Sequence, residues 1–255
     1  MNLLTADIVE RFYGFLWPMM RISAFLAVAP VFSLNAFNLR LRILLALVVT
    51  WLIFPLHTWP KLDPVSASGL VEIFNQLTIG VLMGLVMQIV VASLVVAGQN
   101  IATSMGLSMA SMVDPNMGNV PVLSQLLIIA STLIFVGFGG HTMTLALIAD
   151  SFESLPVGVS ILSQETQGRM LRWSSMMFLG SLLIALPVVV TLLFINIGLG
   201  VVTRAAPSLN IFAVGFPAMI LAGFLILFMT MGSIGGRIEW LWMQGFNMLR
   251  ELLGG

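Results

Sequence analysis

Four stretches of this chain carry no charged side chain, and each is longer than a membrane span requires. They cover residues 73–113, 115–149, 173–203 and 205–236. About 20 apolar residues in a helix are enough to cross the hydrocarbon core of a bilayer. A charge at the centre of an inserting helix costs about 2.5–3.5 kcal/mol, whereas each Leu, Ile, Phe or Val contributes about 0.3–0.6 kcal/mol in favour. The charge pattern therefore predicts a polytopic membrane protein.

The composition supports the same conclusion and excludes several kinds of partner. Charged residues make up 8% of the chain and hydrophobic residues 59%, whereas a soluble domain carries about 25% charged residues. So few charges cannot cover a water-facing surface, and we expect contact with lipid, with other apolar subunits, or with both. The formal net charge is zero and no basic tract occurs, which argues against a nucleic-acid partner. The absence of Cys excludes disulfides and thiolate metal sites.

Six apolar segments are predicted to form long helices. Each is too long for a strand, and a lipid-exposed segment must satisfy its own backbone hydrogen bonds, which favours helix. We predict an all-α membrane protein that forms one domain over residues 1–255. The six segments are about 12–34, 43–59, 70–97, 122–149, 173–202 and 211–236.

Proline and glycine positions predict where these helices bend or approach one another. Pro30, Pro187 and Pro217 fall in the first, fifth and sixth segments, where each removes a backbone donor and favours a kink. Gly80 and Gly84 form a GxxxG spacing in the third segment, which permits close contact between helices.

The connections and the start of the chain are less informative. Asp7 and Glu10 precede the first apolar segment, where a secretory signal would place basic residues, so we expect an uncleaved membrane segment. Residues 150–172 form the one long polar connection. Basic residues lie on both sides of the predicted spans, and the positive-inside rule therefore does not fix the orientation.

Residues that could support catalysis are scattered. His57 and His141 lie far apart and have no acidic neighbour at metal-ligand spacing, and no G-x-S-x-G motif occurs. Asp114 and Asp150 fall at loop edges rather than inside predicted spans. A membrane enzyme needs such groups clustered on one plane. The pattern therefore predicts a non-enzymatic protein with neither metal nor cofactor.

Glu72 allows two interpretations. It stands near the predicted start of the third segment, and an acid in the first turn of a helix favours the helix dipole. Alternatively, an acid inside a membrane segment often takes part in an ion pair or a proton pathway. The sequence leaves both interpretations open.

Residues 98–116 are small, polar and rich in methionine, although they lie between two strongly apolar segments. Met105, Met109 and Met112 recur at helical spacing. They could form a core stripe of a long helix that ends at Asp114 and Pro115, or a deformable seal, because methionine adapts to variable shapes. Periodicity alone does not choose between the two.

The order of four motif blocks gives the chain a resemblance to a known family. They are residues 21–32 (RISAFLAVAPVF); residues 97–99, 105–107 and 112–115 (AGQ, MGL, MVDP); residues 139–141, 150–152 and 156–158 (GGH, DSF, PVG); and residues 186–187, 204–212 and 215–217 (LP, RAAPSLNIF, GFP). Together they resemble the FliR/SctT family of type III export-gate subunits, over nearly the whole chain.

The resemblance implies a fold, an assembly and a location. The family fold is similar to a fusion of FliP and FliQ, with kinked helices arranged as hairpins. One copy joins FliP and FliQ in a gate that passes unfolded flagellar substrates, with FlhB beside its cytoplasmic entrance. The expected place is the flagellar basal body in the bacterial inner membrane, in contact with lipid. Two alternatives are the equivalent injectisome subunit and a small-solute secondary transporter; the latter usually shows paired repeats, which are not obvious in this sequence.

The resemblance also assigns roles to individual residues. A plug loop between the third and fourth helices maps to about residues 106–122. The plug and gating residues are Met105, Gly106, Met109, Met112, Asp114, Pro115, Asn116 and Met117. The expected subunit-interface residues are Arg21, Glu72, Gly80, Gly84 and Gln99. The turn at the cytoplasmic entrance contains Arg204, Pro207 and Asn210.

Overall fold

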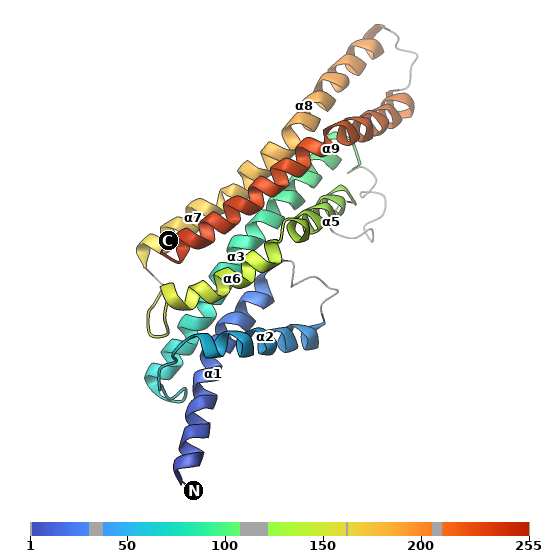
Figure 1. Ribbon diagram of the computed structural model, residues 1–255. Coiled ribbons are helices and arrows are strands. Elements are labelled where there is room, and N and C mark those ends of the chain that lie inside the picture. The colour runs from blue at the N-terminus through green and yellow to red at the C-terminus, as the bar shows by residue number, and fades with distance from the viewer. Residues whose placement is uncertain (1, 31–37, 108–121, 162, 206–210, 255) are drawn as a thin grey trace. The chain divides into compact units, whose positions relative to one another are not determined.

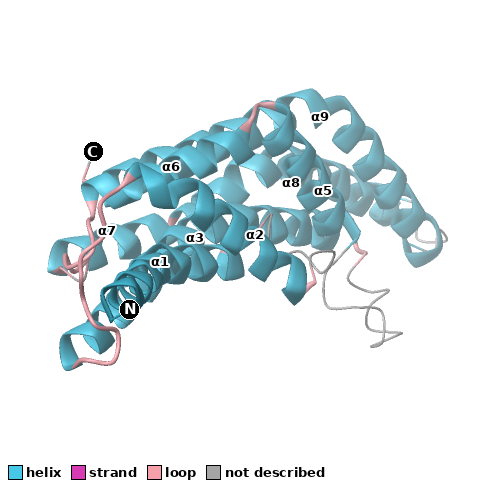
Figure 2. Cartoon of the chain, turned by 60° about the horizontal axis from the view of Figure 1, so that its bottom comes forward, coloured by secondary structure: helices cyan, strands magenta, loops and turns pink. Residues whose placement is uncertain are grey.

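The computed structural model describes residues 2–30, 38–107, 122–161, 163–205 and 211–254. Every regular element in these ranges is a helix (Figures 1 and 2), which confirms the predicted all-α class. The chain divides into two compact units, called here unit 1 and unit 2. Unit 1 comprises residues 1–89, 139–174 and 244–255; unit 2 comprises residues 90–138 and 175–243.

The helices are long, and two of them contribute to both units. The helices of unit 1 are α1 (Asn2–Val28), α2 (Leu39–Ile53), the short η1 (Phe54–Leu56), the first part of α3 (Ala67–Ser104), α6 (Gly140–Ser154), α7 (Gln164–Ser174) and the end of α9 (Ile211–Leu252). Unit 2 contains the end of α3, α5 (Val122–Gly137), α8 (Met176–Ala205) and most of α9.

Several helices are long and apolar enough to span a bilayer. Within the described ranges there are four such spans, at residues 39–56, 67–104, 164–205 and 215–252, and up to five if α5 and α6 together count as one. This confirms the predicted membrane class. α1 is not among them; its first turns carry Asp7, Glu10 and Arg11.

The fourth predicted helix, 122–149, is wrong as a single element. It is two helices, α5 and α6, separated by a short break. Gly139 lies in the break with φ of 80°, a left-handed backbone conformation that other residues rarely adopt. The glycines at residues 137, 139 and 140 thus mark a break inside the apolar stretch rather than its end.

The long polar connection at residues 150–172 is also mostly helical. α6 continues to Ser154, and α7 occupies Gln164–Ser174. Within α7 the Arg169 Nη2 donates to Glu165 Oε1 at 2.7 Å, one turn away. Such pairs support an exposed polar helix, which an apolar pattern alone does not reveal. α9 likewise continues past the predicted end at residue 236, as far as Leu252.

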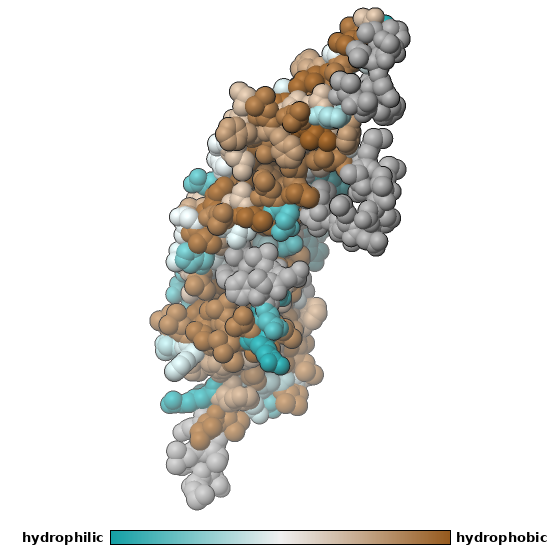
Figure 3. All heavy atoms as spheres, turned by 90° about the vertical axis from the view of Figure 1, so that its right-hand side faces the viewer, coloured by the Kyte–Doolittle hydropathy of each residue, from teal (hydrophilic) through white to brown (hydrophobic). Residues whose placement is uncertain are grey.

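Apolar side chains remain exposed along several helices. In Figure 3 brown residues cover much of the face shown, and teal residues form small groups. The exposed side chains include Leu44, Val48, Trp51 and Leu52 on α2; Phe178, Leu182, Leu186, Leu193, Phe194 and Ile197 on α8; and Leu221, Phe224, Leu225, Phe228 and Met229 on α9. Apolar surfaces this extensive require lipid or a neighbouring apolar subunit.

Candidate functional site

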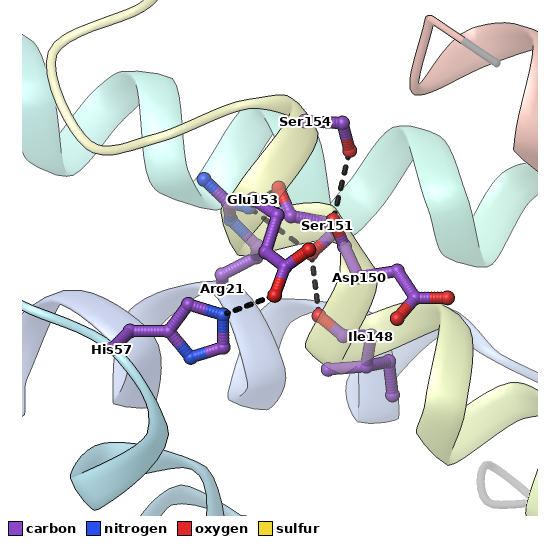
Figure 4. Close-up of polar contacts among 7 residues, drawn as sticks. All are labelled: Arg21, His57, Ile148, Asp150, Ser151, Glu153 and Ser154. Carbon is purple, nitrogen blue, oxygen red and sulfur yellow. Dashed lines mark hydrogen bonds and ion pairs between the residues drawn. The ribbon is translucent and has the colours of Figure 1, made fainter.

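Arg21 of α1 is the most deeply buried charged residue of unit 1, with 1% of its surface exposed. Its Nε donates to Gln76 Oε1 at 2.8 Å. Its Nη1 donates to the carbonyl oxygen and the Oγ of Ser151, at 2.6 and 3.0 Å, and its Nη2 donates to the Leu155 carbonyl oxygen at 2.7 Å. Figure 4 shows Arg21 directed at Ser151. One guanidinium thereby joins α1, α3 and α6.

The position of Arg21 follows from the end of α6. The last carbonyl groups of a helix have no partner within the helix, and they carry the negative end of its dipole. α6 ends at Ser154, and the Leu155 carbonyl accepts from Arg21. The Ser151 carbonyl accepts both from Arg21 and from the Leu155 N–H. A fork of fixed donors suits this task, so the buried charge is compensated by the helix end.

On the α3 side, a buried amide connects Arg21 to a carboxylate. The Gln76 Nε2 donates to Glu72 Oε1 at 2.6 Å, and the Asn75 Nδ2 donates to Glu72 Oε2 at 3.4 Å. Glu72 is 3% exposed. The interpretation of Glu72 as a first-turn acid is wrong, because α3 begins at Ala67. Glu72 is instead the last residue of a buried chain of hydrogen bonds that runs from Arg21 through Gln76.

Aromatic rings cover the other side of Arg21. The guanidinium carbon lies 4.2 Å from the centre of the Phe152 ring, a cation–π geometry. The ring of Trp59 packs edge-on against Phe152 at 5.3 Å between centroids. His57 also packs against Phe152, and its Nε2 lies 3.8 Å from Glu153 Oε1 (Figure 4). These rings shield the charged group from water.

Gly80 and Gly84 allow α3 to approach α1 closely, as the GxxxG spacing predicts. A Cβ at Gly80 would lie 2.3 Å from the Arg21 carbonyl oxygen, and one at Gly84 would lie 2.7 Å from Val28 Cβ. Both glycines therefore make close contacts within this chain, and so do Arg21 and Glu72. Of the five expected interface residues, only Gln99 is exposed.

In unit 2, α3 ends just before a glycine, and this end of the helix is called here the α3 stop. Gly106 has φ of 81°. Its N–H donates to the Thr103 carbonyl at 3.0 Å, and the Leu107 N–H donates to the Ala102 carbonyl at 2.9 Å. This pair of bonds is a Schellman motif, which terminates helices at glycine. The interpretation of one long helix that ends at Asp114 and Pro115 is therefore wrong, because α3 ends at Ser104.

The residues at this stop pack against α9. Met105 is fully buried, and a Cβ at Gly223 would lie 2.5 to 2.8 Å from atoms of the Met105 side chain. A Cβ at Gly106 would lie 3.0 Å from the Phe216 ring. Met105 is therefore a core residue of unit 2, and it holds the end of α3 against α9.

Most of the other predicted plug and entrance residues lie outside the described residues. These are Met109, Met112, Asp114, Pro115, Asn116, Met117, Pro207 and Asn210. Arg204 lies in the last turn of α8 and is exposed.

The Arg21 cluster and the end of α3 hold helices together through hydrogen bonds and packing. Within the described ranges, no group of three or more His, Cys, Asp or Glu residues could hold a metal ion. The sequence did not predict that Gln76, Ser151 and Phe152 belong to the Arg21 cluster. Ser151 and Phe152 fall in the third motif block, whereas Gln76 falls in none of the blocks.

Known proteins resemble the chain along nearly its whole length. Flagellar biosynthetic protein FliR of Pectobacterium carotovorum subsp. carotovorum is 36% identical over 251 residues, which are 97% of this chain and 95% of that protein. FliR of Escherichia coli K12 is 32% identical over 94% of this chain and 92% of its own length. FliR of Bacillus subtilis 168 is 27% identical over 97% of each chain. Residues 12–245 match the bacterial export proteins, family 1, and the chain belongs to that family.

Proposed function

We propose that this chain is a membrane subunit of the flagellar type III protein export gate. The observation that carries the proposal is the extent of the similarity: one relative called flagellar biosynthetic protein FliR matches 97% of this chain over 95% of its own length. Both chains are thus covered almost completely, so the similarity concerns the whole protein. The proposed task is to help form and seal a conduit for unfolded flagellar proteins, without a catalytic step.

Assembly with other membrane proteins is the next part of the proposal. α2, α8 and α9 expose large apolar side chains along their length, and such surfaces are stable only against lipid or apolar partners. We propose FliP and FliQ as those partners, with one copy of this chain in each gate, and FlhB near the exposed Arg204. The proposed place is the bacterial inner membrane, within the flagellar basal body.

We propose that the interface residues act in two ways. Gln99 is exposed near the end of α3 and contacts a partner directly. Arg21, Glu72, Gly80 and Gly84 are buried and act indirectly, because they hold α1, α3 and α6 in the arrangement that the partners bind.

The sealing role is proposed for residues 106–122. Two observations support it. Gly106 ends α3 with a fixed geometry, and Met105 holds that end against α9. Met109, Met112, Asp114, Pro115, Asn116 and Met117 then form the deformable stopper, and Arg204, Pro207 and Asn210 form the entrance turn.

Complementation tests the function. The chain is expressed in a flagellated bacterium that lacks its own FliR, and swimming and flagellin in the medium are measured. Restored swimming and secretion are expected. Stable insertion of the chain without secretion would contradict the proposal. Saturable uptake of a small solute by the purified chain alone in liposomes would favour the transporter alternative.

A leak measurement tests the stopper separately. Deletion of residues 106–122 is compared with the intact chain in membranes that contain the whole gate, and the decay of an imposed ion gradient is followed. A faster decay is expected, because the deletion opens the conduit. An unchanged decay in a gate of normal composition would contradict the stopper while leaving the gate assignment intact.

A further inference from the structure

A backbone carbonyl of α8 lacks its usual donor. Proline has no N–H, so the carbonyl of the residue four positions earlier loses its helical hydrogen bond. Pro187 lies inside α8, and the carbonyl concerned is that of Leu183. Both residues belong to the candidate membrane span at residues 164–205. In a bilayer no water replaces the missing donor, and an unsatisfied carbonyl is costly there.

The missing donor is supplied from α9. The Arg237 Nη1 donates a hydrogen bond to the Leu183 carbonyl oxygen, and both residues belong to unit 2. Arg237 also lies in a candidate span, residues 215–252, and it ends a charge-free stretch of about 30 residues. Charged residues in such segments are rare and are retained for specific interactions.

One turn away from the Arg237–Leu183 contact, α8 and α9 lie close together, which keeps the contact in place. A Cβ at Gly180 of α8 would lie 2.8 Å from Leu241 Cδ2 of α9. Gly180 precedes Leu183 by one turn of α8, and Leu241 follows Arg237 by one turn of α9. This spacing matches an antiparallel pair, and the absence of a side chain at residue 180 lets the two helices approach.

We propose that Arg237 is a positioning residue that satisfies the carbonyl released by Pro187 and thereby fixes the register of α9 against α8. An arginine suits this position because its guanidinium keeps its charge where water is scarce and offers several donors in a rigid plane. The inference rests on this contact and does not depend on the proposed export function.

A double-mutant cycle between positions 187 and 237 tests it. The four forms of the full chain are the natural sequence, Arg237→Met, Pro187→Ala and the combination, each purified within its membrane complex. Arg237→Met alone should lower the melting temperature by about 2–4 °C or more. Alanine at position 187 restores the N–H that Leu183 needs, so the combined variant should melt close to Pro187→Ala. Arg237→Lys, which retains one donor group, should fall between the natural sequence and Arg237→Met.

The controls separate this contact from a general effect of charge. Arg250→Met removes an exposed arginine from the same helix and should leave the melting temperature unchanged. If Arg237→Met does not accumulate in membranes, recovery of its amount by Pro187→Ala supports the proposal. An equal loss from Arg237→Met in both backgrounds, whether of melting temperature or of amount, overturns it, because Arg237 would then act independently of the Leu183 carbonyl.

Discussion

The Arg21 cluster of unit 1 and the stop at the end of α3 in unit 2 hold helices together by different physical means. The cluster, formed by Arg21, Glu72, Gln76, Ser151 and Phe152, relies on directional hydrogen bonds between fixed groups. The α3 stop, formed by Met105, Gly106, Phe216 and Gly223, relies on a glycine conformation and on a flexible thioether. The first arrangement tolerates little displacement, whereas the second can adjust.

The tasks proposed for the two arrangements differ correspondingly. The Arg21 cluster is proposed to keep three helices in one arrangement, and the α3 stop is proposed to hold the start of the deformable stopper. A buried charge whose partners are removed becomes strongly destabilising, so the Arg21 cluster specifies one arrangement of α1, α3 and α6. Methionine changes rotamer at low cost and fills irregular space, so the contact at the α3 stop can persist when the groups around Met105 shift. A subunit that seals a conduit needs both properties in one chain.

Among the changes that test this comparison, removal of the Arg21 guanidinium should lower the stability of the protein most. Arg21→Met leaves Glu72 and Gln76 buried without their cationic partner. It also removes the Arg21 donor from the Leu155 carbonyl, whereas the Ser151 carbonyl keeps the Leu155 N–H. The free energy of unfolding should fall by about 3–5 kcal/mol, measured by titration with denaturing detergent in mixed micelles. Arg11→Met, an exposed change on the same helix, is the control. Equal stability of the two variants would show that the cluster is not fixed by its charge.

A methyl group at Gly80 should have the next largest effect. It would lie 2.3 Å from the Arg21 carbonyl oxygen, and backbone cannot yield as a side chain does. We expect Gly80→Ala to lower the free energy of unfolding by about 1–3 kcal/mol through overpacking, in the same titration. Gly198→Ala in α8, where nothing lies within 4 Å, should be neutral or more stable by about 0.5–1 kcal/mol. A neutral Gly80→Ala would mean that α1 and α3 are not in close contact.

Gly106→Ala tests the backbone part of the α3 stop. The φ of 81° is unfavourable for any residue with a Cβ, by about 1–2 kcal/mol. We expect a loss of that size in the free energy of unfolding. Gly137→Ala, at a position with open space and without positive φ, serves as the control. If both variants lose the same amount, the loss at position 106 does not come from the left-handed conformation.

Gly223→Ala should have the smallest effect and sharpens the contrast with Gly80. The three atoms nearest to the added methyl group all belong to the side chain of Met105, which can change rotamer. We expect a loss below about 1 kcal/mol, because overpacking is relieved when the neighbour moves. Combination with Met105→Ala should recover part of the stability that Met105→Ala loses, because the new methyl group fills the space. A loss from Gly223→Ala as large as that from Gly80→Ala would show that the two contacts are equally rigid.

The motif blocks of the sequence meet in pairs in the structure. Residue 21 of the first block contacts residues 151 and 152 of the third, within unit 1. Residue 106 of the second block lies against residue 216 of the last, within unit 2. The order of the blocks was visible in the sequence, but these pairings were not, because they join residues about 110 to 130 positions apart.

The sequence by itself determined the helical membrane class, the main apolar spans and the family, because charge-free runs and motif order are local properties of the chain. It also predicted the close approach at Gly80, since a GxxxG spacing places small residues on one helix face. Tertiary structure decided the rest. It shows that Glu72 is buried, that the fourth apolar segment is interrupted at Gly139, and that Arg237 donates to the carbonyl that Pro187 leaves free. Each of these depends on which distant group completes a hydrogen bond or fills a space, and that is settled only when the helices pack.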